Sequence, residues 1–478
     1  MSSENQQPFT TPEWVKHAVF YQIFPERFAN GDPSNDPENV QPWGSPPAIS
    51  NFMGGDLQGI IDHLPYLADL GITALYLTPI FLSPSNHKYH TDDYYRIDPR
   101  FGTLETFHAL LKAAHDRGIR IILDGVFNHS GRGFFAFTDI LENDAASPYL
   151  KWYIISGLPL NPYDGSKPAN YEAWWGMRAL PKFNTDHQPV RDYLLGVARY
   201  WIEQGIDGWR LDVPNEIADH NFWREFRRIV KEVNPEAYIV GEIWQDASPW
   251  LDGTQFDAVM NYVFRDLCRD YFAQGKITTE AFAQGIETLL QRYPLEATLA
   301  QLNLLGSHDT PRYLTEAGGS IPKVKQTVLF QACFPGAPCI YYGDEIGLEG
   351  GGDPFCRAAF PWDESAWNHE LRDFVKTCIA IRHAHPALRT GKWRTLLASN
   401  TIRIMAFGRW NDDEVLIPVI NTSAKTRTLD IPLADLPLPD GVVLRDLLSE
   451  RSCHVYKNRL EGVTVPAQGG LVLHYARQ

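Results

Sequence analysis

The sequence has little of what marks secreted, membrane-spanning or fibrous proteins. It has six cysteines in 478 residues and no Cys-x-x-Cys pair, and Cys333, Cys339 and Cys378 lie in apolar surroundings. No apolar run reaches the roughly 18–20 residues of a membrane-spanning helix. The N-terminus lacks a basic start followed by an apolar stretch, so we expect no secretory signal. Free thiols in a reducing cytoplasm explain the cysteines better than disulfides, which remain the alternative.

Positive charge is also scarce. The chain has 43 Lys and Arg against 58 Asp and Glu, a net charge of −15, and no basic block. This predicts neither nucleic-acid nor anionic membrane partners. Hydrophobic residues make up 44% and charged residues 21%, which excludes disordered and fibrous classes. Aromatic residues reach 13%. They suit either core packing or sugar stacking, and composition does not distinguish the two.

Eight short apolar runs alternate with amphipathic, helix-like segments. The apolar runs are 18–24, 74–81, 120–127, 208–213, 238–244, 256–264, 299–305 and 339–342. The helix-like segments are 57–70, 104–117, 190–204, 221–233, 279–292 and 323–332. Apolar strands separated by helices indicate a parallel sheet buried on both faces. Eight of them predict an α/β fold, the (β/α)₈ barrel. The rival open sheet is disfavoured because no Gly-rich phosphate loop follows the first strand.

Two regions interrupt this alternation. Residues 130–181 form a long insertion rich in aromatics, Pro, Gly and Asn, which is typical of a functional subdomain. From 391 onward, short alternating runs with turn residues between them predict an antiparallel β-sandwich domain. We therefore expect a barrel of residues 1–129 and 182–390, an inserted subdomain of 130–181 and a C-terminal β domain of 391–478.

Several acidic residues follow the predicted strands, where a barrel places its chemistry. Asp124, Asp212, Glu242 and Asp309 each stand at or just after a strand end. Arg210 is two residues before Asp212 and so points to the same face, where it would keep that carboxylate ionised. Glu242 follows an apolar stretch, and desolvation would favour its protonated form. A nucleophile beside an acid on adjacent strands is the arrangement of a retaining glycosidase.

Other interpretations of these residues are weaker. A single strand-end aspartate is often only a helix cap, but three acids with an arginine and two histidines at one rim are harder to explain that way. Metal-dependent hydrolysis would use the same residue types, yet no His-x-His or His-Glu-x-x-His spacing occurs. A serine nucleophile would need a Gly-x-Ser-x-Gly turn, which is absent.

At these motifs the sequence resembles the α-amylase family of glycoside hydrolases. Within that family it is similar to the cyclomaltodextrinase, neopullulanase and maltogenic amylase group. The matching segments are DGVFNH at 124–129, GWRLDVPNE at 208–216, EIW at 242–244, SHD at 307–309, LPKFN at 180–184, QIFPERF at 22–28 and GAPCIYYGDE at 336–345. The likeness covers essentially the whole chain.

The resemblance implies a role for each matching residue. Asp212 matches the nucleophile, Glu242 the acid/base and Asp309 the stabiliser of the transition state. The substrate-binding positions that match are His87, Tyr89, Asp124, His129, Arg210, Trp244, His308, Asn215 and Glu216. The last two correspond to a pair associated with tolerance of α-1,6 as well as α-1,4 bonds. Pro214 stands where the group usually has a small residue, which leaves the bond preference open.

A loop after the first strand is rich in oxygen ligands. By itself it reads as a polar turn with Asx caps. The resemblance instead implies a structural calcium ion, which binds six to eight oxygens. The aligned residues are Asn30, Asp32, Asn35, Asp36, Gly54 and Asp56.

We therefore expect a cytoplasmic hydrolase of α-1,4 and α-1,6 glucosidic bonds in cyclodextrins, pullulan, maltooligosaccharides and branched oligosaccharides. Transglycosylation is a further reaction the resemblance leaves open. The alternatives are a debranching enzyme that prefers α-1,6 bonds, a glucanotransferase, and a non-catalytic sugar-binding protein. The presence of all three acids disfavours the last of these alternatives.

The group's extra N-terminal β domain is expected to be absent, because the first strand begins near residue 18. A more open site would follow. Oligomeric state stays undetermined.

Overall fold

The computed structural model describes residues 9–477, which divide into two compact units. Among the described residues, unit 1 holds the chain up to Glu13, Phe20–Met260 and Arg357–Phe360. Unit 2 holds Trp14–Val19, Asn261–Cys356 and the chain from Pro361 onward. In the described part of the chain, no helix combines the length and apolarity needed to span a bilayer.

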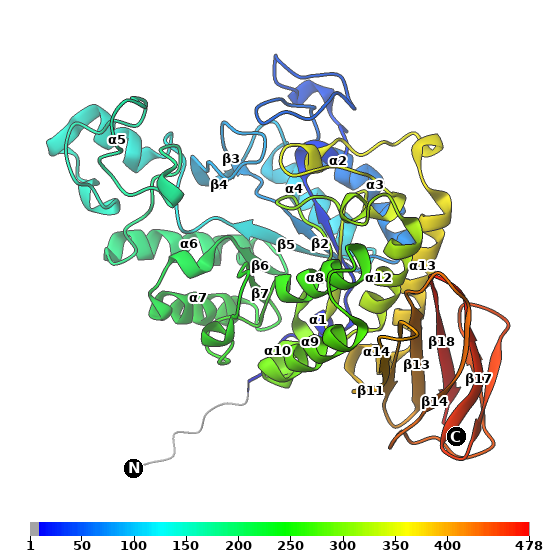
Figure 1. Cartoon of the computed structure of the whole chain (residues 1–478). Helices are drawn as coiled ribbons and strands as arrows, with labels where there is room; N and C mark the ends of the chain where they lie inside the picture. Colours follow the sequence, from blue (N-terminus) through cyan, green and yellow to red (C-terminus); the bar gives the residue numbers. More distant parts are fainter. Residues whose placement is uncertain (1–8, 478) are drawn as a thin grey trace, which may run out of the picture. The chain divides into compact units, whose positions relative to one another are not determined.

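Unit 1 contains six parallel strands in the order β8-β7-β6-β5-β2-β1. Figure 1 labels four of them, β2, β5, β6 and β7. Their bounds are β1 (Phe20–Ile23), β2 (Ala74–Leu77), β5 (Arg120–Gly125), β6 (Gly208–Leu211), β7 (Tyr238–Gly241) and β8 (Ala258–Val259). Nearly every residue of these strands is buried, as the apolar runs predict. A small antiparallel pair, β3 (Phe81–Leu82) and β4 (Asp93–Ile97), lies between β2 and β5 in the sequence.

The helices of unit 1 follow the predicted segments closely. They are α2 (Pro25–Phe28), α3 (Leu57–Leu70), α4 (Leu104–His115), α5 (Phe135–Asn143), α6 (Gln188–Glu203) and α7 (His220–Val233). The Asp56 carboxylate caps α3 by accepting from the Gly59 N–H at 2.7 Å, and Gly71 ends the helix with φ of +92°. Residues 130–181 contain α5 and three short 3₁₀ helices, η2 (Asp144–Ala146), η3 (Leu150–Trp152) and η4 (Trp174–Gly176).

Unit 2 contains two further parallel strands, β9 (Leu302–Leu304) and β10 (Ala337–Tyr341). Its helices are α8 (Tyr262–Cys268), α9 (Thr279–Arg292), α10 (Leu295–Ala300), α11 (Tyr313–Glu316), α12 (Ile321–Cys333), α13 (His369–Ala384) and α14 (Pro386–Thr390). The five-residue α1 (Glu13–His17) comes first in the chain.

Two predicted strands are shorter than expected. Of 256–264, only β8 is extended, because the Asn261 side chain accepts from the Phe264 N–H at 3.1 Å and starts helix α8. Of 299–305, the first two residues end α10, and β9 begins at Leu302. Apolar runs of this length do not distinguish a strand from a buried helix.

The C-terminal part of unit 2 is an eight-stranded antiparallel sheet in the order β11-β12-β13-β18-β15-β16-β17-β14. It is coloured from orange to red in Figure 1. Its strands are β11 (Lys392–Ser399), β12 (Ile404–Trp410), β13 (Glu414–Asn421), β14 (Arg427–Pro432), β15 (Val443–Asp446), β16 (Ser452–Tyr456), β17 (Arg459–Val465) and β18 (Gly469–Ala476). Alternate residues of β14 to β17 face inward, and their side chains join a separate hydrophobic core that includes Ile417, Leu444 and Leu473.

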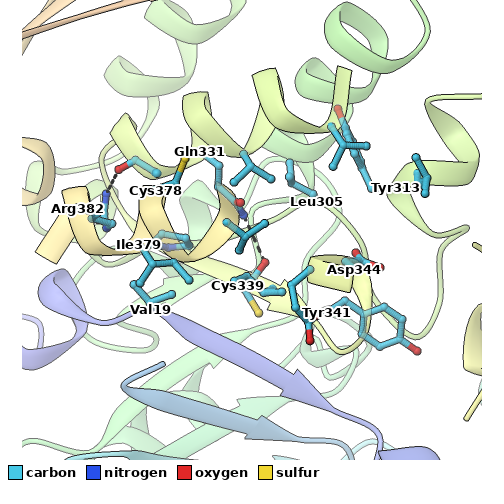
Figure 2. Close-up of a pocket in the computed structure, with 18 residues that line it drawn as sticks. Val19, Leu305, Tyr313, Gln331, Cys339, Tyr341, Asp344, Cys378, Ile379 and Arg382 are labelled. Carbon is cyan, nitrogen blue, oxygen red and sulfur yellow. Dashed lines mark hydrogen bonds between the residues drawn. The ribbon is translucent and has the colours of Figure 1, made fainter. Parts of the chain in front are cut away.

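A small cavity of about 40 Å³ lies inside unit 2 among β10, α12 and α13. Figure 2 shows Gln331 donating to the Cys339 carbonyl and the Arg382 guanidinium donating to a backbone carbonyl at its edge. Burial lowers the pKa of Arg382 to about 9. The residues that line the cavity are mostly apolar, so we interpret the cavity as a packing void and not as a substrate site.

Candidate active site

One buried guanidinium joins three carboxylates in unit 1. Arg210, on β6, donates from Nη1 to both oxygens of Asp124 at 2.8 and 2.9 Å and to Asp212 Oδ1 at 3.1 Å. Its Nη2 lies 2.9 Å from Glu242 Oε2. The carboxylates come from the C-terminal ends of β5, β6 and β7, which are hydrogen-bonded neighbours. The parallel register of these strands therefore brings Asp124, Asp212 and Glu242 close together.

Asp124 is fixed by two further donors. The Tyr76 hydroxyl donates to its Oδ2 at 2.6 Å and the Tyr89 hydroxyl at 2.8 Å. Burial raises the pKa of Asp124, whereas Arg210 and the tyrosines oppose that rise. Burial also raises the pKa of both tyrosines, so they remain protonated donors. With all these bonds already made, Asp124 suits an orienting role better than attack on substrate.

Asp212 and Glu242 are nearly buried, at 8% and 4% exposure. Glu242 Oε2 accepts from the Val213 N–H at 3.2 Å, and Oε1 accepts from Trp244 Nε1 at 3.1 Å. Val213 adopts a left-handed φ of +36°, which is costly for a β-branched residue and is typical of functional turns. Desolvation of Glu242 is therefore not its only influence, because two N–H groups donate to its carboxylate and the Arg210 guanidinium lies 2.9 Å away.

A tight turn presents His87 and Tyr89. The Tyr89 N–H donates to His87 Nδ1 at 3.1 Å, which leaves Nε2 to carry the proton of the neutral ring. Lys88, between them, has φ of +63° and is fully buried, and its Nζ lies 2.9 Å from Asp98 Oδ2. Its ammonium also faces the Phe101 ring at 4.8 Å. Burial lowers the pKa of Lys88 to about 8.

His129 connects β5 with the inserted segment. It is 1% exposed, and burial together with nearby His90 lowers its pKa to about 3, so its ring is neutral. Its backbone pairs with that of Lys182, and its ring stacks on Trp174 at 5.6 Å. Lys182 Nζ in turn donates to the Glu216 carbonyl at 3.0 Å.

Asn215 and Glu216 lie in the 3₁₀ helix η5 (Pro214–Glu216), which begins two residues after Asp212. Asn215 is exposed and Glu216 is half-buried. Trp244, the predicted aromatic of the leaving-group side, is 45% exposed beyond Glu242. All three residues lie in loops that follow β6 or β7, where the barrel fold predicts substrate contacts.

The remaining predicted acid belongs to unit 2. Asp309 follows β9, and its side chain is 34% exposed. His308 Nε2 lies 3.1 Å from Asp309 Oδ2, and the Asp309 N–H donates to Ser307 Oγ at 3.2 Å. The loop therefore presents Asp309 with a defined orientation.

The oxygen-rich loop of unit 1 contains suitable metal ligands. The Oδ1 atoms of Asn30 and Asn35 are buried and have no hydrogen-bond partner among the described residues. Burial raises the pKa of Asp36 and Asp56, which a bound cation would offset. A Cβ on Gly54 would lie 2.1 Å from Asp36 Oδ1, so only glycine fits there.

Asp56 also holds this loop in place through hydrogen bonds to its carboxylate. Its carboxylate accepts from Gly31 N, Asp32 N and Asn35 Nδ2 at 2.8–3.1 Å. Asp32 accepts from Ser34, which lowers its pKa. The polar-turn interpretation is therefore correct for part of the loop, and the unpaired amide oxygens are what favours a cation. Together these residues fit calcium, which prefers carboxylate and carbonyl oxygens.

Sequence reasoning missed several residues that shape the site. Tyr76 was counted only as part of an apolar strand, although a tyrosine among strand aliphatics usually has a partner for its hydroxyl. Lys88 lies between two predicted site residues, His87 and Tyr89, and Lys182 lies in the LPKFN segment, but the sequence assigns neither lysine a role. Trp174 belonged to an aromatic-rich insertion whose fold the sequence does not specify.

Comparisons with known proteins agree with this geometry. The alpha amylase catalytic domain matches residues 22–395. A cyclomaltodextrinase of Geobacillus thermopakistaniensis is 51% identical over 89% of this chain and 72% of its own length. A solved cyclic alpha-maltosyl-(1→6)-maltose hydrolase from Arthrobacter globiformis has 44% identity and a TM-score of 0.89, covering 98% of this chain and all of that one. A solved debranching enzyme from Nostoc punctiforme has 45% identity, the same TM-score of 0.89 and the same coverage.

These matches confirm the predicted fold class, a (β/α)₈ barrel followed by a C-terminal antiparallel β domain. The motifs around Arg210 lie inside the matched catalytic domain. The chain therefore belongs to the alpha-amylase family of glycoside hydrolases, and it is similar to the cyclomaltodextrinases and neopullulanases of that family.

Proposed function

We propose that this protein hydrolyses α-1,4 and α-1,6 glucosidic bonds with retention of configuration. Its substrates would be cyclodextrins, pullulan, maltooligosaccharides and branched oligosaccharides. The observation that carries the proposal is the cluster in which Arg210 contacts Asp212 and Glu242 together. Two carboxyl groups held by one cation suit a two-step displacement, in which one attacks and the other transfers the proton.

In the first step Asp212 attacks the anomeric carbon while Glu242 protonates the departing glucosidic oxygen. In the second, Glu242 takes a proton from water, and that water displaces Asp212 from the sugar. The resemblance to the α-amylase family assigns to Asp309 the stabilisation of the positive charge that develops on the ring. Glu242 must carry a proton to begin the cycle, because it protonates the departing oxygen in the first step.

The product anomer tests the mechanism. Two inversions at the anomeric carbon release the α-anomer first, and NMR detects it before mutarotation. Fresh β-anomer would contradict both the mechanism and the roles of Asp212 and Glu242. A retaining geometry also requires carboxyl oxygens about 5–5.5 Å apart in a substrate complex, against roughly 6.5–9.5 Å for inversion.

A debranching enzyme that prefers α-1,6 bonds is the second candidate. It is favoured by the similarity to the Nostoc punctiforme enzyme, which this chain covers completely. Product analysis on pullulan, β-cyclodextrin and a maltosyl-branched oligosaccharide separates the two. Activity on the branched substrate alone would support debranching, and cleavage of all three would support the broader hydrolase.

Two further properties belong to this proposal. We infer that the loop of Asn30, Asn35, Asp36 and Asp56 binds calcium as a structural ion, which would hold the loop without taking part in the chemistry. We also infer a cytoplasmic location. This is supported by six free, buried cysteines and by the similarity to an intracellular maltogenic amylase of Bacillus subtilis.

A further inference from the structure

A surface pocket of about 570 Å³ in unit 1 contains none of the three acids assigned to the reaction, and Glu216 is the one predicted substrate-binding residue in its lining. Its walls come from the end of the inserted segment and from η5. The lining includes Tyr171, Glu172, Trp174, Trp175, Arg178 and Glu216. Pockets of this size that combine aromatic rings with a few polar groups are typical small-molecule sites.

Trp175 is the most unusual residue of this pocket. Its side chain is 78% exposed, and its backbone adopts φ of +50°, a conformation that costs free energy in any residue other than glycine. An exposed indole on a strained backbone is unfavourable for folding alone, since it leaves a large apolar surface in water. Together these features favour a role in binding.

The indole of Trp175 is the outer member of a stack of three rings, and the innermost ring is that of the buried His129. The Trp175 and Trp174 rings are 4.7 Å apart and nearly parallel, with an angle of 13° between them. Trp174 stacks in turn on His129 at 5.6 Å. The Trp174 Nε1 atom is buried and has no hydrogen-bond partner among the described residues, so it is a donor available to a ligand.

The pocket is also tied to the catalytic loop. Glu216 lines it and lies four residues after Asp212, so the two Cα atoms are at most about 14 Å apart. Lys182, another lining residue, donates to the Glu216 carbonyl at 3.0 Å. A ligand extending from the cleaved bond could therefore reach the pocket.

The charge of the lining narrows the ligand class. Glu172 and Glu216 are balanced by Arg178 and Lys182, so a strongly charged ligand of either sign would meet repulsion. A neutral polyhydroxyl compound suits both features, because charged side chains bind its hydroxyls and an aromatic face packs against its C–H face.

We propose that this pocket is an accessory subsite that holds a glucosyl unit of the uncleaved arm of a branched α-glucan, with the Trp175 ring as its stacking surface. This rests on the proposed function and adds to it the part of the substrate that selects branched chains. Short linear substrates do not reach the pocket.

The test compares the wild type with Trp175→Ala on two substrates. One is a maltooligosaccharide with a single α-1,6-linked maltosyl branch, and the other is a short aryl maltoside. We expect Trp175→Ala to raise KM for the branched substrate at least tenfold, with kcat changed less than twofold and the aryl maltoside kinetics unaffected. Trp175→Phe, which keeps a ring, should recover most of the affinity.

Tyr163→Ala is the matched control, since Tyr163 is 72% exposed in the same inserted segment but does not line the pocket. It should behave as wild type. Unchanged KM of Trp175→Ala for the branched substrate, or an equal loss on both substrates, would overturn the subsite. Failure of the wild type to cleave any α-glucan would instead overturn the proposed function.

Calorimetry tests the subsite independently of turnover. It compares binding of the branched compound to Asp212→Asn with binding to the double variant that also carries Trp175→Ala, and we expect the double variant to bind more weakly.

Discussion

At the scale of single residues, the two carboxylates that Arg210 contacts should behave differently when each is made neutral. Asp212→Asn removes the nucleophile, so we expect kcat to fall by at least about 10⁴-fold with an unchanged fold. Glu242→Gln removes the proton donor and should largely spare an aryl glycoside whose leaving group needs no proton. Steady-state kinetics and circular dichroism measure both effects. Near-normal turnover of Asp212→Asn would contradict its role.

Lys88 is predicted to position its neighbours His87 and Tyr89. Lys88→Met leaves Asp98 with only the more distant Arg100, at 3.6 Å, as its cation. The change should lower the free energy of unfolding by roughly 1–3 kcal/mol and raise KM more than it lowers kcat. Lys88→Gly relieves the left-handed backbone but also loses the ion pair. We expect Lys88→Gly to bind substrate more weakly than the wild type, because the lost ion pair outweighs the relief of backbone strain. Wild-type affinity in this variant would contradict that expectation.

Lys88 also makes the free energy of unfolding depend on pH in the alkaline range. Burial lowers its pKa to about 8, below the ordinary 10.5. Between these values the unfolded chain binds more protons than the folded one, so the contribution of Lys88 to stability rises with pH. Over the same range the Asp98 ion pair is lost, and KM should rise. Both dependences should vanish in Lys88→Met, as measured by urea denaturation and kinetics from pH 7 to 10.

At the scale of elements, the oxygen-rich loop before α3 should depend on calcium. Chelation should lower the Tm, because a ligand at 100 times its Kd contributes about 2.7 kcal/mol to the folded state. The rate at moderate temperature should change less. Gly54→Ala forces a Cβ into Asp36, so this variant should have a low Tm that calcium does not raise. A wild-type Tm indifferent to chelator and to added calcium would contradict the proposed ion.

A second element-scale prediction concerns Glu414, which connects β13, β18 and the start of α14. It accepts from His385 at 2.7 Å, from the Ala387 N–H at 2.9 Å and from His474 at 3.2 Å. Burial alone would raise its pKa, but these hydrogen bonds lower it to about 2. The resulting stability, roughly 3 kcal/mol, is complete above pH 4.5 and is lost as the pH falls toward 2.

Glu414→Gln should therefore lower the unfolding free energy at pH 7 by about that amount, and by less than half as much at pH 3. Urea denaturation at both values measures the difference. Glu461→Gln, an exposed position on β17, is the control and should change stability by less than about 0.5 kcal/mol. An equal loss for Glu414→Gln at both pH values would show that the carboxylate charge does not matter.

At the scale of the whole molecule, the six cysteines should be unreactive until the chain unfolds. All six are free and buried. Burial raises the pKa of Cys268 and Cys378 well above the ordinary value and that of Cys333 to about 12, so few thiolates form at neutral pH. We expect slow labelling of the native protein by a thiol reagent and six labels per chain in denaturant. A Tm that drops on reduction would contradict this picture.

Much of the molecule could be predicted along the chain. The two periodicities located the buried strands and amphipathic helices, and strand ends located Asp124, Asp212 and Glu242, because a parallel register brings consecutive strand ends to one edge. The start of helix α8 was missed, since residues 262–264 continue the apolar run of 256–264 and only the Asn261 cap shows that a helix begins there. The ends of elements depend on such single hydrogen bonds.

The sequence by itself determined the order of strands and helices and the chemical types at the strand ends, since both follow from local pattern. Only the tertiary structure decided that the guanidinium beside Asp212 also contacts Asp124 and Glu242, that Lys88 pairs with Asp98, and that Glu414 lies between His385 and His474. These partners are far apart or on different elements, and the energies of their contacts come from removal of water, which occurs only when the chain has packed.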